Sequence, residues 1–121
     1  MKTGLVIEDN EDNMMLITRL LKKAGYNAQW APTGGKGLEM GKTDHSDFIL
    51  LDIQVPDIDG TEVLQMLRNA EYGKSIPVIV VTSYAMAGDR EKFLAAGANA
   101  YLEKPIDPLR VINQIQNVVG Q

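Results

Sequence analysis

At 121 residues, the chain is shorter than the ~150 residues of an average domain, so we expect a single domain spanning residues 1–121. Twelve Lys and Arg against sixteen Asp and Glu give a net charge of −4, which argues against a dedicated nucleic-acid-binding protein. The chain has no cysteine and a single histidine. Disulfide frameworks, thiolate metal sites and multi-histidine metal clusters are therefore excluded.

The apolar segments are short. The longest apolar run covers residues 76–81, far below the ~20 residues that a membrane-spanning helix needs. The first residues are too few and too polar to form the apolar region of a signal peptide. We therefore expect a cytoplasmic protein that does not associate with membranes.

Short apolar runs alternate with amphipathic segments from the beginning of the chain to its end. Three of the runs are apolar on both faces of a strand, which is typical of parallel strands covered by helices on both sides. The expected strands, in chain order, are 5–7, 28–31, 48–51, 78–81 and 99–102.

Helical patterns separate these runs. The first has apolar residues at positions 14, 17, 21 and 24 and stops at Gly25. The second is rich in glycine, which lowers its helix propensity. The last begins with Asp107 as the N-cap and Pro108 in the first turn. The expected helices lie around 14–24, 34–41, 63–67, 93–96 and 108–119. This alternating order predicts an α/β fold with an open parallel sheet and helices on both faces.

Polar residues follow four of the expected strands. Glu8 and Asp9 follow the first strand, Asp52 the third, Thr82 the fourth and Lys104 the fifth. Each has an unremarkable alternative interpretation, such as acidic residues that start a helix, a turn threonine or a solvated lysine. Because the carboxyl ends of parallel strands meet at the edge where α/β proteins bind ligands, we expect these residues to converge.

The expected cluster holds three carboxylates and one ammonium group. Two unit charges 4 Å apart interact by about 4 kcal/mol at an effective dielectric near 20. Negative charge therefore remains uncompensated unless a carboxylate takes up a proton or a cation binds. Oxygen ligands suit a hard cation such as Mg²⁺. The sequence thus predicts a metal-assisted phosphoryl-transfer site with a carboxylate as the candidate nucleophile.

These motifs resemble the receiver domain of two-component response regulators, in its single-domain, chemotaxis-regulator-like form. The resemblance covers essentially the whole chain. It implies a flavodoxin-like, doubly wound, five-stranded parallel sheet of order 2-1-3-4-5 with five helices. The matching segments are 8–10, 52–60, 82–83, 95–98 and 104–105.

The resemblance also implies roles for the residues at the strand ends. Asp52 would accept a phosphoryl group from a histidine kinase or phosphotransfer protein, and Lys104 would pair with the phosphoryl oxygens. Pro105, after a cis peptide bond, would fix the direction of that lysine. The ligands of Mg²⁺ would be Glu8, Asp9, Asp52 and the main-chain carbonyl of Gln54.

Signalling would follow from a switch. Thr82 would bond the phosphoryl group, and Tyr101 would fill the space that Thr82 leaves. Gln54 and Tyr84 would tune the lifetime of the phosphoryl group, with the bulky Tyr84 excluding water and slowing autodephosphorylation. The downstream protein target would bind the fourth helix, fifth strand and fifth helix around Tyr101, and activation could drive homodimerisation. Such a domain assists its own phosphorylation but is not a turnover enzyme.

Three other functions remain open from the residues alone. A haloacid-dehalogenase-like Mg²⁺ phosphohydrolase also uses a strand-end Asp, but Gln54 stands where that class has its second Asp, and no cap segment is present. A flavodoxin-like redox carrier conflicts with Glu8 and Asp9, which would repel the FMN phosphate. A phosphorylation-independent interaction module is the third. We interpret Trp30 as a packing or partly exposed residue. The glycine-rich run 33–37 lacks Walker spacing, so we interpret it as a turn entering a helix.

Overall fold

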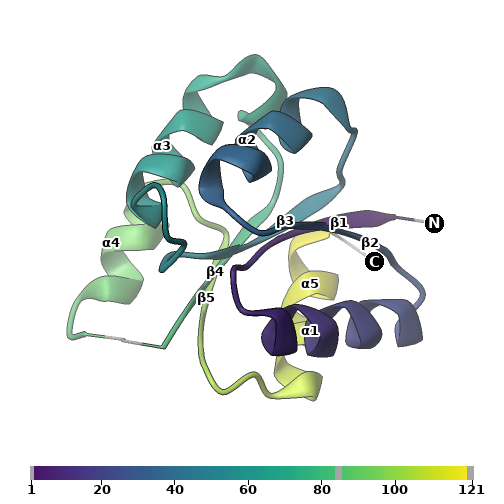
Figure 1. Cartoon of the computed structure of the whole chain (residues 1–121). Helices are drawn as coiled ribbons and strands as arrows, with labels where there is room; N and C mark the ends of the chain where they lie inside the picture. The colour runs from purple at the N-terminus through teal and green to yellow at the C-terminus, as the bar shows by residue number, and fades with distance from the viewer. Residues whose placement is uncertain (1, 84–85, 120–121) are drawn as a thin grey trace.

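The computed structural model of the chain describes residues 2–83 and 86–119. Within these residues, five strands alternate with five α-helices and one short 3₁₀ helix (Figure 1). The elements are β1 (Thr3–Ile7), α1 (Glu11–Lys23), β2 (Asn27–Ala31), α2 (Gly34–Thr43), β3 (Phe48–Asp52), α3 (Gly60–Asn69), η1 (Glu71–Gly73), β4 (Val78–Thr82), α4 (Asp89–Ala95), β5 (Ala100–Glu103) and α5 (Pro108–Val119). The predicted α/β class is confirmed.

The strands form one parallel sheet in the order β2-β1-β3-β4-β5. Helices α1 and α5 lie on one face of the sheet, and α2, α3 and α4 cover the other (Figure 1). This is the doubly wound order 2-1-3-4-5 that the resemblance implied. The order reverses between β1 and β3, so the crevice for a ligand lies at the carboxyl ends of these two strands.

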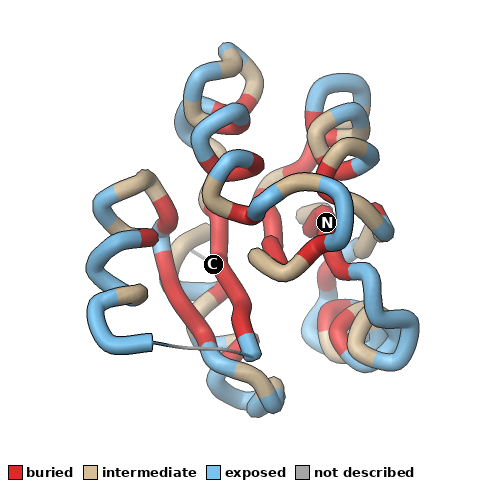
Figure 2. The backbone as a smooth tube through the Cα atoms, turned by 60° about the vertical axis from the view of Figure 1, so that its left-hand side comes forward, coloured by how far each residue is buried: buried red, intermediate tan, exposed pale blue. Residues whose placement is uncertain are grey.

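The core lies on both faces of the sheet. Every residue of β3 and β4 is buried, and the strands form the buried interior in Figure 2. One apolar cluster joins the sheet to α2, α3 and α4, and a second joins it to α1 and α5. Helices on both sides explain why these strands are apolar without alternation.

The observed ends of the elements differ from the expected ones by a few residues. Helix α1 begins at Glu11, ahead of its apolar stripe, because the Asn10 side chain accepts a hydrogen bond from the Asn13 amide at 2.9 Å and caps the helix. Strands β3 and β4 each continue one residue further than expected, through Asp52 and Thr82, because both residues still pair with the neighbouring strand. The polar residues are thus the last residues of these strands.

Helix α2 shows why its sequence is rich in glycine. A Cβ atom on Gly37 would lie 2.5 Å from Cδ1 of Ile7 on β1. Glycine here lets the helix backbone approach the sheet closely. The glycine content therefore reflects packing against β1, and the prediction that the run 33–37 enters a helix is confirmed, with Thr33 as the N-cap. Among the described residues, no helix has the length and apolar character to cross a membrane.

Candidate functional site

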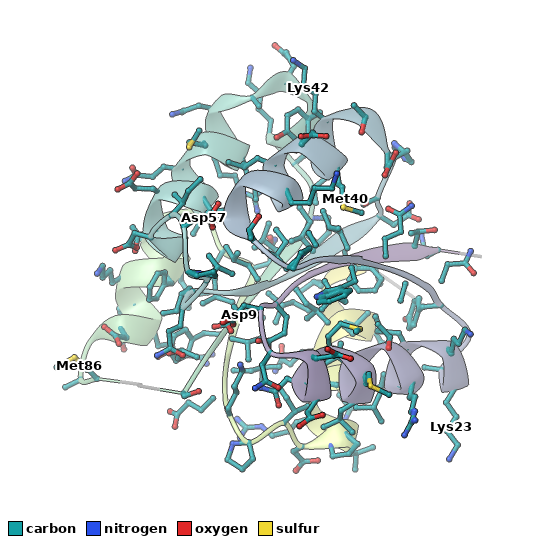
Figure 3. All side chains as sticks on the ribbon, viewed as in Figure 1. Asp9, Lys23, Met40, Lys42, Asp57 and Met86 are labelled. Carbon is teal, nitrogen blue, oxygen red and sulfur yellow. The ribbon has the colours of Figure 1, made fainter. Side chains whose placement is uncertain are left out.

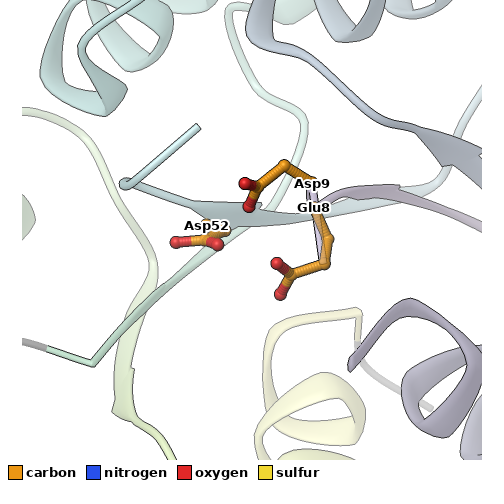
Figure 4. A group of neighbouring side chains, drawn as sticks. All are labelled: Glu8, Asp9 and Asp52. Carbon is orange, nitrogen blue, oxygen red and sulfur yellow. The ribbon is translucent and has the colours of Figure 1, made fainter. Parts of the chain in front are cut away.

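The carboxyl edge of the sheet gathers the predicted polar residues. Asp52 and Thr82 end β3 and β4, while Glu8 and Lys104 directly follow β1 and β5. Figure 4 shows the carboxylates of Glu8, Asp9 and Asp52 close together at this edge. One oxygen from each of the three carboxylates lies within 4.8 Å of the others. The convergence expected from the sheet topology is therefore observed.

Lys104 bridges the two buried carboxylates of this cluster. Its Nζ lies 2.9 Å from Oε1 of Glu8 and 3.1 Å from Oδ2 of Asp52. The Lys104 amide donates to the carbonyl of Thr82 at 2.8 Å, and the peptide bond to Pro105 is cis, as predicted. The main chain of β5 thus holds the lysine next to the ends of β3 and β4.

The remaining carboxylate oxygens have different surroundings. Oδ1 of Asp52 accepts the Gln54 amide at 2.9 Å, and Oε2 of Glu8 accepts the Asn10 amide at 3.1 Å. Glu8 and Asp52 are only 1% and 4% exposed, whereas Asp9 is exposed. Two of the carboxylates, Glu8 and Asp52, are therefore buried next to the half-buried Lys104, while the third, Asp9, faces solvent.

Burial changes the pKa values of Glu8 and Lys104. It raises the pKa of the Glu8 carboxyl from 4.5 to about 7; the hydrogen bond from Lys104 opposes this rise, and the nearby Asp52 adds to it. Burial also lowers the pKa of the Lys104 ammonium, but its bond to Glu8 and the charge of Asp52 outweigh burial and raise it. The raised pKa of Glu8 therefore reflects mainly its removal from water, with the neighbouring Asp52 carboxylate as a smaller contribution.

The donor set fits a hard divalent cation. All three side chains offer carboxylate oxygens, and Mg²⁺ is typically bound by one or two carboxylates together with waters and phosphate oxygens. The exposed Asp9 leaves one side of the cluster open to such additional ligands. The carboxylate cluster therefore has the chemistry of a hard-cation site.

The two residues expected to form the switch lie on the neighbouring strands β4 and β5. Thr82 is completely buried. Tyr101 is 6% exposed and its ring is stacked on Phe93 of α4, with 5.9 Å between the centroids. The side chain of Gln54 accepts the Ser83 amide at 3.1 Å, which ties the segment after β3 to the segment after β4. The expectation for Tyr84 falls outside the described residues.

Two contacts at this edge were not anticipated from the sequence. The indole Nε1 of Trp30 donates to the main-chain carbonyl of Glu8 at 2.6 Å. The Asp57 carboxylate accepts the amides of Gly34 and Gly35 at 2.8 and 2.9 Å, which caps the start of α2 from the loop after β3 (Figure 3). Sequence spacing gives no signal for the contact between Asp57 and the start of α2. The position of Trp30 near the end of the strand beside β1 was the only available hint.

Fold and site together define a class of doubly wound α/β proteins that carry an acidic, lysine-bridged cluster at the switch point of the sheet. The family of response regulator receiver domains matches residues 5–116. The chain belongs to this family.

Known proteins resemble the chain over nearly its whole length. The polar-differentiation response regulator DivK of Brucella ovis is 40% identical over 119 residues, covering 98% of this chain and 97% of that protein. A CheY-like response regulator receiver domain protein from Methanospirillum hungatei superposes with a TM-score of 0.91 at 29% identity, covering 99% and 94% of the two chains.

A third relative carries a metal. The receiver domain of a sensor histidine kinase from Pseudomonas aeruginosa superposes with a TM-score of 0.90 at 32% identity, covering 99% of this chain and 98% of that one, and its structure has a magnesium ion coordinated in the active site cleft.

Membership of this family fixes the general function. The chain is a phosphorylation-dependent signalling switch of the two-component type, a signalling domain and not an enzyme in the usual sense. Receiver domains act with histidine kinases or phosphotransfer proteins. The match favours this function over the phosphohydrolase, the redox carrier and the phosphorylation-independent module.

Proposed function

We propose that Asp52 is the phosphoacceptor of this receiver domain and that Lys104 and Thr82 assist its phosphorylation. One observation carries the proposal: Asp52 is a buried carboxylate that ends a central strand, with the Lys104 ammonium 3.1 Å from its Oδ2. A carboxylate is a weak nucleophile, so it needs neighbouring positive charge to stabilise the phosphoryl group that it attacks.

Mg²⁺ is the cation that the pocket would take, with Glu8, Asp9, Asp52 and the main-chain carbonyl of Gln54 as ligands. The convergence of the three carboxylates supports this set. Bound there, the ion would neutralise charge on the phosphoryl oxygens. Because Lys104 already bonds to Glu8 and Asp52, the ion and the lysine would share these two carboxylates.

The transfer itself is a simple exchange of bonds. An Asp52 carboxylate oxygen forms a bond to phosphorus, while the bond from phosphorus to the imidazole nitrogen of a phosphohistidine donor breaks. The imidazole leaves with the bonding electrons and takes up a proton, and Asp52 becomes an acyl phosphate. Lys104, held between Glu8 and Asp52, is placed to pair with the phosphoryl oxygens once they arrive.

The new charge then acts on the segment after β4. A phosphoryl group carries nearly two negative charges and strong hydrogen-bond acceptors; since it replaces the single charge of the Asp52 carboxylate, the site gains about one negative charge. Thr82 and the Ser83 amide are the nearby donors, and Gln54 now holds that amide. Movement of this segment would release the packing around Tyr101, whose ring is stacked on Phe93. The switch would thus change the surface formed by α4, β5 and α5.

We assign the remaining roles on the same basis. Gln54 tunes the lifetime of the acyl phosphate, because its side chain links the two segments beside Asp52, and Tyr84 is proposed to do so from the sequence alone. The donor is a cytoplasmic histidine kinase or phosphotransfer protein. The downstream protein binds the surface of α4, β5 and α5, the surface through which an activated homodimer would also form.

Phosphorylation by a small-molecule donor tests the proposal. Incubation with acetyl phosphate and Mg²⁺ should add one phosphoryl group per chain by intact-mass spectrometry, and chelation of the metal should abolish the addition. The Asp52→Asn variant should stay unmodified. The matched Asp44→Asn variant, altered at the end of α2 and on the opposite edge of the sheet, should react like the parent. Equal modification of Asp52→Asn and parent would refute the assignment.

A further inference from the structure

Trp30 makes a contact that packing does not require. It lies on β2, is half-buried, and its indole N–H donates to the main-chain carbonyl of Glu8 at 2.6 Å. The two residues are 22 positions apart in the chain. The bond therefore joins the edge strand of the sheet to the segment that carries two of the three clustered carboxylates.

The bond between Trp30 and Glu8 lies where β1 stops pairing with β2. The two strands are in register up to Ile7 and Ala31, and the Glu8 amide still donates to the Ala31 carbonyl at 3.0 Å. The Glu8 carbonyl comes after this last bond. In a continuing parallel ladder it would accept an amide from β2; instead it accepts the indole of Trp30.

The departure from the ladder matters for the carboxylates. Consecutive side chains along an extended chain leave it on opposite sides, so Glu8 and Asp9 reach Asp52 from two sides only if the main chain between them is held in one orientation. Here the Glu8 and Asp9 carboxylates approach Asp52 together (Figure 4). The chain bends at Asp9 just after leaving β1, and the orientation of the peptide group between Glu8 and Asp9 determines where both side chains begin. The carbonyl of this peptide group belongs to Glu8, which is only 1% exposed. Without the indole donor, this carbonyl would be buried without a hydrogen-bond partner, because water hardly reaches it.

We propose that Trp30 is a positioning residue for the divalent cation site: its indole N–H fixes the peptide between Glu8 and Asp9, so that both carboxylates are presented to one ion. The inference rests on the proposed metal site. Trp30 touches neither ion nor phosphoryl group and acts through the main chain of Glu8. A tryptophan that served packing alone would contribute to the free energy of unfolding and leave cation affinity unchanged.

A tryptophan isostere separates these two roles. Because the chain has one tryptophan, growth of a tryptophan auxotroph on β-(3-benzothienyl)alanine changes this position alone and replaces the indole N–H by sulfur, with the size of the ring system nearly unchanged. Mg²⁺ binding is measured by titration calorimetry at a pH and temperature where urea titrations show both proteins fully folded. The isostere should bind Mg²⁺ about three- to tenfold more weakly, the range that one net hydrogen bond supplies.

Two further variants serve as checks. Trp30→Phe also lacks the N–H and should weaken Mg²⁺ binding to a similar extent. Tyr72→Phe removes a comparable donor, the hydroxyl that bonds to the Leu38 carbonyl at 3.1 Å on the α2 side of the sheet, and should leave the affinity at the parent value.

The outcomes distinguish this inference from the site on which it rests. If the parent binds Mg²⁺ and the isostere and Trp30→Phe bind it equally well, the positioning role is wrong and the metal site stands. If Asp9→Asn binds Mg²⁺ as the parent does, the metal site itself is wrong and the inference falls with it.

Discussion

Removing the charge of Glu8 should change how the stability of the metal-free protein depends on pH. Glu8 is 1% exposed and its pKa is raised from 4.5 to about 7 by burial. Between these values the folded protein keeps the Glu8 proton and the unfolded chain has lost it. The free energy of unfolding should therefore fall as the pH rises through this window.

The size of the effect follows from the shift. One pKa unit corresponds to about 1.4 kcal/mol, so ionising Glu8 in the folded protein costs on the order of 3 kcal/mol between pH 4.5 and 8. Glu8→Gln keeps one oxygen that can accept from Lys104 and loses the second oxygen, which accepts the Asn10 amide. That loss does not depend on pH, and the glutamine never acquires a charge. The free energy of unfolding of Glu8→Gln should therefore not fall in this way as the pH rises.

Urea unfolding in the presence of a chelator, at pH 5, 6, 7 and 8, measures the difference between the two proteins. The advantage of Glu8→Gln should grow with pH and approach its maximum by pH 8. Glu62→Gln, an exposed position on α3, should follow the parent at every pH. Adding Mg²⁺ to the parent should reduce the decline, because the ion compensates the charge. A difference between Glu8→Gln and parent that stays constant from pH 5 to 8 would refute the reasoning.

Two predictions concern the framework of the site, and both are measured by urea unfolding at neutral pH. Arg68→Ala should lower the free energy of unfolding by about 2–4 kcal/mol. The guanidinium donates to the carbonyls of Gly97, Gly73 and Ile76, and the substitution removes this donor from all three. A decrease below 1 kcal/mol would show that water replaces the arginine. Gly37→Ala should lose about 1–3 kcal/mol, because the new methyl group meets the Ile7 side chain, and unchanged stability would mean that α2 can move away from β1.

The strand ends of the site could be predicted because parallel topology alone decides which residues meet. Once five apolar runs are assigned to one parallel sheet, the residues that follow them share an edge, whatever their detailed contacts. Asp52, Thr82 and Lys104 were identified in this way, and all lie at that edge.

The contacts between side chains could not be predicted in the same way. That the carboxylate of Glu8 reaches Lys104 and that the indole of Trp30 reaches the Glu8 carbonyl depend on the register of β1 with β2 and on side-chain rotamers. Helix α2 illustrates the same limit: propensity counts each glycine as unfavourable, whereas Gly37 is needed because Ile7 lies against the helix. Only the folded neighbours reveal that reason.

The central claim is that carboxylates from the ends of two different strands share one divalent cation. Electron paramagnetic resonance of free Mn²⁺ during a titration counts the bound ions and gives their affinity directly. The parent should bind one ion at the site, and Asp9→Asn and Asp52→Asn should each weaken that binding by about tenfold or more, since affinity follows the number of charged ligands. Asp12→Asn, an exposed residue of α1, serves as the control and should bind as the parent does. Equal affinities in the parent, Asp9→Asn and Asp52→Asn would contradict the claim.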